Sequence, residues 1–120
     1  MANELSSITI DCVDPNLLAQ FWSALLDIPI TDEHVDSGWA TVGSRNDVLP
    51  RLTFQRVAEP KTTKVRLHLD ISTDSVEAAI EQVERLGGSF TGERHDYDEG
   101  IVVVMNDPEG HEFCLVEYFD

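Results

Sequence analysis

The two halves of this 120-residue chain carry the same succession of hydrophobic patterns. In the first half, polar and apolar residues alternate over 7–12, which predicts a strand. Asp14 and Pro15 then suit the N-cap and the first position of a helix that ends near Pro29. Three shorter strands are predicted to follow, over 30–35, 39–42 and 49–57.

The second half repeats this order after a polar stretch, 58–64, that contains both lysines of the chain. Alternation over 65–72 predicts a strand, and Asp74 or Ser75 is expected to cap the helix that follows it. The pair Gly87-Gly88 ends that helix. Three more strands are predicted near 89–94, 100–106 and 112–119.

A repeat of about 60 residues implies two copies of one unit, each covering an open face of the other. The predicted fold class is therefore α+β, with two βαβββ modules that form a curved eight-stranded mixed sheet around a cleft. Both helices are expected on the outside, with Leu17, Phe21 and Leu25 buried against the sheet. We expect a single domain over 1–120, divided into module one, 1–58, and module two, 59–120.

Composition places the chain among ordinary globular proteins. It is 42% hydrophobic and 26% charged, which is too apolar for a disordered chain. No apolar run approaches the roughly 18 residues of a membrane span, and the first residues do not resemble a secretory signal. The two cysteines, Cys12 and Cys114, do not make a disulfide framework. The sequence therefore predicts a cytoplasmic protein without a membrane partner.

The charge excludes further classes of partner. Eight Lys and Arg against 23 Asp and Glu give a net charge of −15, and the acidic residues are spread along the chain. Such a surface repels nucleic acids and anionic lipids, which need a basic footprint. It attracts a cationic small molecule, an effect that salt weakens.

Three sequence blocks carry a resemblance to a known family: VDPNLLAQFWSALLDIP, LHLDIS and NDPEGHEFCLVE. In this order they resemble the glyoxalase / bleomycin resistance / dioxygenase superfamily, also called the vicinal oxygen chelate superfamily. The stretch RLTFQRVAEPKTTKVRLHLDI is similar to a glyoxalase-like subgroup. The resemblance covers nearly the whole chain and implies the paired βαβββ fold and a homodimer.

In the metal-dependent members of this superfamily four side chains, typically His and Glu, hold a divalent ion. The resemblance places these positions at Ser7, at His68, at Cys114, and at Arg51 or Thr53. Glu112 and Glu117 lie nearby as further carboxylates. Because a catalytic metal usually needs three protein ligands, this set implies neither a bound metal nor another cofactor.

Each remaining candidate has a functional and a structural interpretation. His68 is the candidate catalytic acid or base, or a ligand-anchoring group, and otherwise a hydrogen-bonded core histidine. Cys114 is a core or site-lining residue in preference to a nucleophile. Trp39 suits the wall of a pocket. Gln55 is a hydrogen-bond partner for a ligand carbonyl, or otherwise a solvated strand residue. Tyr97 is expected in a hairpin loop, either over the mouth of the cleft or in solvent.

Two functions stay open at this stage. In the first, the protein binds or sequesters a small molecule in its cleft without a metal. In the second, it is a lyase, isomerase or dioxygenase of the same superfamily that uses His68 as acid or base, or an atypical metal site. The predicted ligand-binding residues are Ser7, Trp39, Thr53, Gln55, His68 and Cys114.

Overall fold

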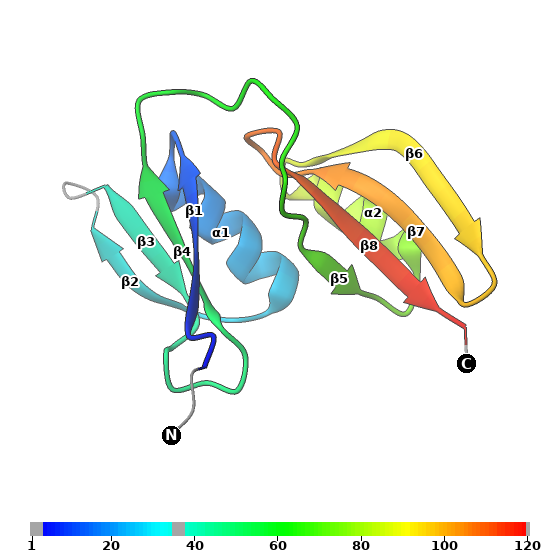
Figure 1. Ribbon diagram of the computed structural model, residues 1–120, viewed down its shortest axis with the longest axis horizontal. Coiled ribbons are helices and arrows are strands. Elements are labelled where there is room, and N and C mark those ends of the chain that lie inside the picture. The colour runs from blue at the N-terminus through cyan, green and yellow to red at the C-terminus, as the bar shows by residue number, and fades with distance from the viewer. Residues whose placement is uncertain (1–3, 35–37, 120) are drawn as a thin grey trace. The chain divides into compact units, whose positions relative to one another are not determined.

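The computed structural model describes residues 4–34 and 38–119. Contacts divide the chain into two compact units, Met1–Pro60 and Lys61–Asp120. Each unit contains a βαβββ succession of elements, as Figure 1 shows in chain order. The predicted pair of modules is therefore confirmed.

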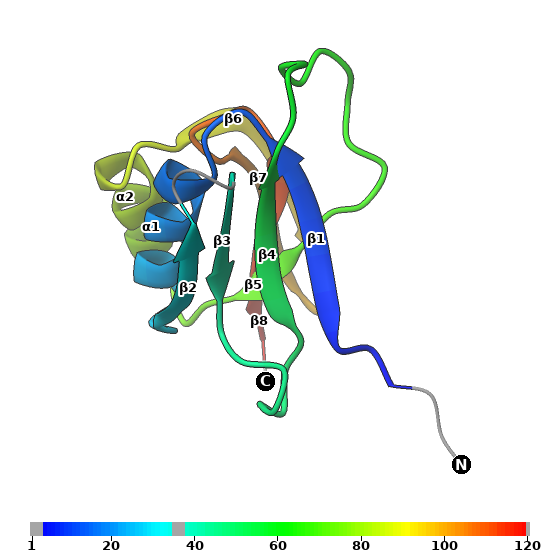
Figure 2. The same cartoon turned by 90° about the vertical axis from the view of Figure 1, so that its left-hand side faces the viewer.

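The first unit is a four-stranded sheet with one helix on it. Its elements are β1 (Ser7–Cys12), α1 (Pro15–Leu26), β2 (Ile30–His34), β3 (Trp39–Val42) and β4 (Arg51–Arg56). The strand order is β1-β4-β3-β2, visible edge to edge in Figure 2, with β1 and β4 parallel and the other neighbours antiparallel. Val35, which we expected to end the second strand, lies outside the described residues.

Helix α1 begins and ends where the sequence predicts. The Asp14 carboxylate accepts a hydrogen bond from the backbone N–H of Leu17, and Asp27 ends the helix in the left-handed conformation. Phe21 is buried against the sheet, but Leu17 is 44% exposed, so its predicted burial is wrong. Leu25 is only half-buried, so its predicted burial is not met in full. The buried residues of α1 are Pro15, Leu18, Ala19, Phe21 and Trp22, and Leu17 lies at the edge of that stripe.

The second unit repeats the architecture with different element lengths. Its elements are β5 (Asp70–Ser72), α2 (Val76–Arg85), β6 (Ser89–Tyr97), β7 (Gly100–Asn106) and β8 (Glu112–Tyr118). The strand order is β5-β8-β7-β6, with β5 and β8 parallel. Of the two predicted N-caps of α2, it is Ser75 whose side chain accepts the N–H of Ala78.

Two predicted strand boundaries in this unit are wrong. The strand expected over 65–72 begins only at Asp70, because the chain before it is held by the Glu112 side chain instead of a strand ladder. Strand β6 extends to Tyr97, since 94–97 pairs with Gly100–Val103 around a tight turn. Tyr97 therefore lies on a strand and not in a hairpin loop.

The eight described strands form two separate four-stranded sheets, so the predicted continuous eight-stranded sheet is wrong. The physical reason is that every strand ladder closes within its own unit, and β5 is only 3 residues long. Each helix packs on one face of its own sheet, over Phe54 in the first unit and Phe113 in the second, both fully buried. Within the described part of the chain, no helix has the length and apolarity that a membrane crossing requires.

Candidate functional site

Polar side chains gather on the face of the first sheet that points away from α1. Strand register pairs Thr9 with Thr53, and Trp39 and Asp11 with Gln55. Because side chains alternate along a strand, these residues share one face, while Leu52 and its i+2 neighbour point to the helix. The structure therefore brings together four of the six predicted ligand-binding residues: Ser7, Trp39, Thr53 and Gln55.

Three hydroxyls form a row across this face, from β1 through β4 to β3. The Ser7 Oγ lies 3.4 Å from the Thr53 Oγ1, and the Thr41 Oγ1 lies 3.5 Å from the same Thr53 oxygen. These distances are well above the roughly 2.7–2.8 Å of a strong O–H···O hydrogen bond. Since each hydroxyl can donate once and accept twice, this hydroxyl row leaves most of its hydrogen-bonding capacity unused. Thr41 is not among the residues predicted for the ligand site, although its spacing of two from Trp39 indicates that both side chains lie on the same face of the sheet.

Two nitrogen-bearing side chains flank the hydroxyl row. The Trp39 indole is 40% exposed, and its N–H donates to the Asp32 carboxylate at 3.5 Å. Arg51, which pairs with Ser7 in the β1–β4 ladder, has a buried Nε without a hydrogen-bond partner in the described structure. This face thus offers hydroxyls, an amide, an indole and a guanidinium.

The other two predicted site residues belong to the second unit. His68 is exposed and precedes β5, in a segment without regular secondary structure. Cys114 is buried on β8, and its strand partner is Asp70. The structure therefore does not place His68 opposite Cys114.

Asp70 is the residue that sequence reasoning missed. Asp70, which pairs with Cys114, stands five positions before the cap Ser75, as Thr9, which pairs with Thr53, stands five positions before the cap Asp14. By the same count His68, which the family resemblance places at a metal-ligand position, corresponds to Ser7, since each stands seven positions before its helix cap. Asp70 is the next residue on the same face of the strand, and its alternation with His68 was the available signal.

The environment of Cys114 keeps its thiol protonated. Burial raises the pKa of Cys114, and the negative charges of Asp70 and Glu93 raise it further against a small opposing effect of Lys64. A nucleophilic cysteine needs the reverse, a lowered pKa beside a cation. The position favours a structural or site-lining residue, as the sequence predicts.

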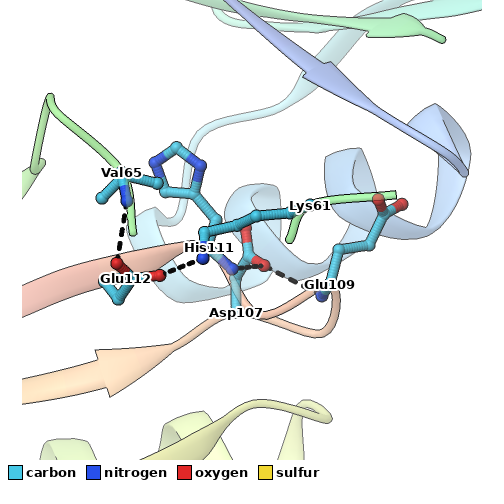
Figure 3. Close-up of polar contacts among 6 residues, drawn as sticks. All are labelled: Lys61, Val65, Asp107, Glu109, His111 and Glu112. Carbon is cyan, nitrogen blue, oxygen red and sulfur yellow. Dashed lines mark hydrogen bonds and ion pairs between the residues drawn. The ribbon is translucent and has the colours of Figure 1, made fainter. Parts of the chain in front are cut away.

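The two further carboxylates on β8 have structural partners. Glu112 accepts the backbone N–H of Val65 at 2.9 Å and forms an ion pair with Lys61 (Figure 3). Glu117 turns to the helix side of β8 and accepts the N–H of Val76 at 2.9 Å, in the first turn of α2. Both carboxylates therefore already bind parts of this chain: Glu112 holds the segment before β5, and Glu117 holds the start of α2.

The motif DPEGHE forms a turn between β7 and β8. Its Asp107 is buried, and one carboxylate oxygen accepts the backbone N–H of Glu109 at 2.9 Å and of His111 at 3.0 Å (Figure 3). A buried carboxylate with two such donors fixes the path of the chain into β8. The most specific motif of the sequence therefore has a structural role.

The donor set does not fit a divalent metal. In the first unit the family positions hold hydroxyls and a guanidinium, and a cation at Arg51 repels a metal ion. In the second unit Asp70 and Cys114 supply two donors, one of them a protonated thiol. Over residues 4–34 and 38–119 there is no group of three or more His, Cys, Asp or Glu arranged to hold a metal.

Comparison with solved structures shows which fold the chain shares. A family enzyme of the glyoxalase/bleomycin resistance protein/dioxygenase type from Burkholderia phytofirmans matches with a TM-score of 0.79 at 13% identity, over 98% of this chain and 100% of that one. A mutant of the fosfomycin resistance protein FosX from Listeria monocytogenes, solved with Mn(II) and a dihydroxypropylphosphonic acid, matches with a TM-score of 0.78 at 19% identity, over 99% and 93% of the two chains. A Nocardioides glyoxalase/bleomycin resistance protein/dioxygenase matches with a TM-score of 0.72 at 14% identity, over 100% and 86%. At these identities the likeness shows the fold.

The family of the chain is shown by a match between its sequence and a family model. The model of the glyoxalase-like domain family matches residues 7–116, and the chain belongs to that family. The resemblance found in the sequence is thereby confirmed. No curated protein matches the chain.

Proposed function

We propose that the protein binds a small polar molecule, rich in hydroxyl or carbonyl groups, on the face of the first sheet that points away from α1. The observation that carries this proposal is the hydroxyl row of Ser7, Thr53 and Thr41, with contacts of 3.4 and 3.5 Å. Ser7 and Thr53 are half-buried and Thr41 is buried. Hydroxyls in such positions with unused donors and acceptors favour a ligand that completes their hydrogen bonds.

The neighbours of the hydroxyl row define the ligand further. Gln55 adds an amide that both donates and accepts, and the exposed Trp39 indole adds a flat surface for packing. The buried Nε of Arg51 adds a donor that suits a carbonyl or carboxylate oxygen. The expected ligand therefore carries several oxygens close together and needs no metal to be held.

Binding is better supported than the enzymatic alternative with His68 as acid or base. A general acid or base has to be held within hydrogen-bonding reach of the reacting group. His68 is exposed and lies on an irregular segment before β5, which does not fix its imidazole in one position. If the alternative were correct, His68→Gln would abolish turnover of a substrate that the hydroxyl row binds.

Ligand-detected NMR on the intact chain tests the proposal, with a panel of sugars, polyols, 2-hydroxy acids and 2-keto acids. We expect at least one class to show saturation transfer from the protein. Thr53→Val removes the central hydroxyl while keeping the shape of the side chain, and it should weaken binding about fivefold or more. Thr62→Val makes the same chemical change on the exposed 58–64 segment and should leave binding unchanged.

Two results would contradict this proposal. One is equal binding by the Thr53→Val and Thr62→Val proteins. The other is a stoichiometric divalent metal in protein purified without a metal-affinity tag, retained through dialysis and required for ligand binding. In that case a metal-dependent reaction would replace simple binding.

We also propose a homodimer, as the family resemblance implies. Two chains with a net charge of −15 repel each other, so raised salt should tighten the association. Sedimentation velocity at several protein and salt concentrations tests this. A single species of 13.4 kDa at high protein concentration would contradict it.

A further inference from the structure

The second unit has a small hollow on the face of its sheet that points away from α2. The hollow has a volume of about 180 Å³. Its lining residues all belong to the second unit: Asp70, Tyr97, Glu99, Gly100, Val102, Val116 and Tyr118. A site for a drug-sized ligand has roughly 300–1,000 Å³, so this volume suits a small molecule or one end of a larger one.

Strand register explains why the sheet is hollow here. Tyr97 on β6 pairs with Gly100 on β7, and Gly100 pairs with Tyr118 on β8. A glycine thus stands between two tyrosines in one row across three strands, and we call this row the tyrosine notch. A Cβ at position 100 would lie 2.3 Å from the Glu117 carbonyl oxygen, so a residue larger than glycine requires β8 to move.

The spacing of the tyrosine notch matches the reach of a cation–π interaction. Neighbouring strands lie about 4.8 Å apart, so the two tyrosines stand about 10 Å from each other along the row. Side chains on strands rise roughly perpendicular to the sheet. A group held midway therefore lies about 5 Å from each tyrosine side chain, within the roughly 6 Å over which a ring attracts a cation that lies over its face. His95 stacks on one face of the Tyr97 ring, so the opposite face is the one left for a ligand.

One wall of the notch is held in place by its neighbours on β6. The Tyr97 ring stacks on the His95 ring, with centroids 5.9 Å apart and an interplanar angle of 18°. The His95 Nε2 in turn lies 2.6 Å from a carboxylate oxygen of Glu93. Although Tyr97 is 55% exposed, these contacts orient its ring before any ligand binds.

The ionisable acids and bases that line the hollow are all acidic. Asp70 and Glu99 line it, and no Lys, Arg or His is among its lining residues. Val102 and Val116 pair with each other in the next row on the same face, beside the row of the two tyrosines, and they form an apolar floor there. An apolar floor, two aromatic walls and two carboxylates complement an alkylated cation better than a strongly hydrated metal ion.

We propose that this hollow is a second binding site, for a small organic cation of the methylated ammonium type. The cation packs between the rings of Tyr97 and Tyr118, and Asp70 and Glu99 balance its charge. The lining residues of the site belong to the second unit, whereas the hydroxyl row belongs to the first, and the site goes beyond the function proposed above.

The experiment uses the intact 15N-labelled protein and tetramethylammonium chloride as the probe, at constant total ionic strength. We expect saturable shifts of the amide signals of Gly100, Val102 and Val116, with a dissociation constant in the millimolar range. tert-Butanol has a similar size and no charge, and it should not produce saturable shifts of these signals. Binding should weaken about threefold or more when sodium chloride is raised from 20 to 300 mM.

Variants identify the walls of the site. Tyr97→Leu and Tyr118→Leu should each weaken tetramethylammonium binding about three- to fivefold, and the double variant should abolish it. Tyr97→Phe and Tyr118→Phe keep the rings and should retain binding. Phe90→Leu is the matched control, because Phe90 is a 36% exposed aromatic residue on β6 that pairs with Met105, on the helix side of the sheet.

The proposal is overturned if tert-butanol and tetramethylammonium shift the same amides equally. It is also overturned if the double tyrosine variant, with an otherwise unchanged amide spectrum, binds as tightly as Phe90→Leu. Thr53→Val should leave tetramethylammonium binding unchanged, and the tyrosine variants should leave binding by the hydroxyl row unchanged. The two proposals can therefore fail independently.

Discussion

The Glu112 carboxylate accepts a hydrogen bond from the backbone N–H of Val65 at 2.9 Å, across 47 positions of sequence. The same carboxylate forms an ion pair with Lys61, and both partners are partly buried. This single side chain therefore fastens the 61–65 segment to the first residue of β8. The contact explains how a segment without a strand ladder keeps a defined path before β5.

Glu112→Gln should release this segment. Glutamine can still accept the Val65 N–H, but it loses the negative charge that pairs with Lys61. We expect a loss of about 1–2 kcal/mol in the free energy of unfolding, because hydrogen bonds to charged groups are the stronger ones. Amide hydrogen exchange should become faster over 61–69. Glu81→Gln, on the exposed side of α2, is the control, and an equal effect of both substitutions would contradict the role of Glu112.

The same contact predicts a pH dependence. Burial opposes ionisation of Glu112, but Lys61 and the Val65 N–H outweigh it, so the pKa is lowered from the ordinary value of 4.5. A lowered pKa in the folded protein means that the stabilisation is complete above the unfolded value and is lost as the pH falls through the folded value. The difference in melting temperature between wild type and Glu112→Gln should therefore be constant above about pH 5.5 and shrink toward pH 3. A difference that grows with acidification would contradict this assignment.

Asp107 should be essential for the turn into β8. Asp107→Ala leaves the backbone N–H groups of Glu109 and His111 without their acceptor, which should cost about 2–3 kcal/mol in the free energy of unfolding. Asp107→Asn keeps an acceptor oxygen at the same place and should restore more than half of that loss. Urea unfolding curves of the three proteins measure this, and equal losses for Ala and Asn would show that the hydrogen bonds are not the cause.

Packing of α1 can be tested at two neighbouring positions on the helix. Phe21 is 2% exposed and meets Trp22 edge to face, with ring centroids 5.3 Å apart. Phe21→Ala should cost about 3–5 kcal/mol in the free energy of unfolding. Leu17→Ala should cost less than about 1 kcal/mol, because Leu17 is largely solvent-exposed. A loss below about 1 kcal/mol for Phe21→Ala would contradict the position of the helix.

Cys114 should react slowly with alkylating reagents, since burial and two nearby carboxylates raise the pKa of its thiol. Asp70→Asn removes one of these charges and should lower that pKa, which raises the rate of reaction with iodoacetamide at pH 8. The measurement needs a Cys12→Ser background, so that one thiol remains. Glu81→Asn removes a distant charge and should leave the rate unchanged. An unchanged reaction rate in Asp70→Asn would contradict an effect of the Asp70 charge on the pKa of the Cys114 thiol.

Local sequence signals predicted most of the fold. The Asp14-Pro15 start of α1, the alternation in β1 and the turn motif before β8 each act through neighbouring residues, so each is readable from the sequence. The family resemblance has the same origin, because it rests on blocks that keep their order along the chain. The predictions that failed are those that depend on pairing between strands far apart in the sequence, such as the single eight-stranded sheet and the start of β5.

Residue composition and alternation by themselves determined two βαβββ units, their helices and the polar side of each strand. Tertiary structure decided which residues face each other. Register makes Asp70 and not His68 the partner of Cys114, and it turns Glu112 toward Lys61 and Val65. Strand register also places Gly100 between Tyr97 and Tyr118, an arrangement that no local sequence pattern predicts. The physical reason is that strand register follows from long-range hydrogen bonds and packing, whereas helix caps and turns follow from residues within a few positions of each other.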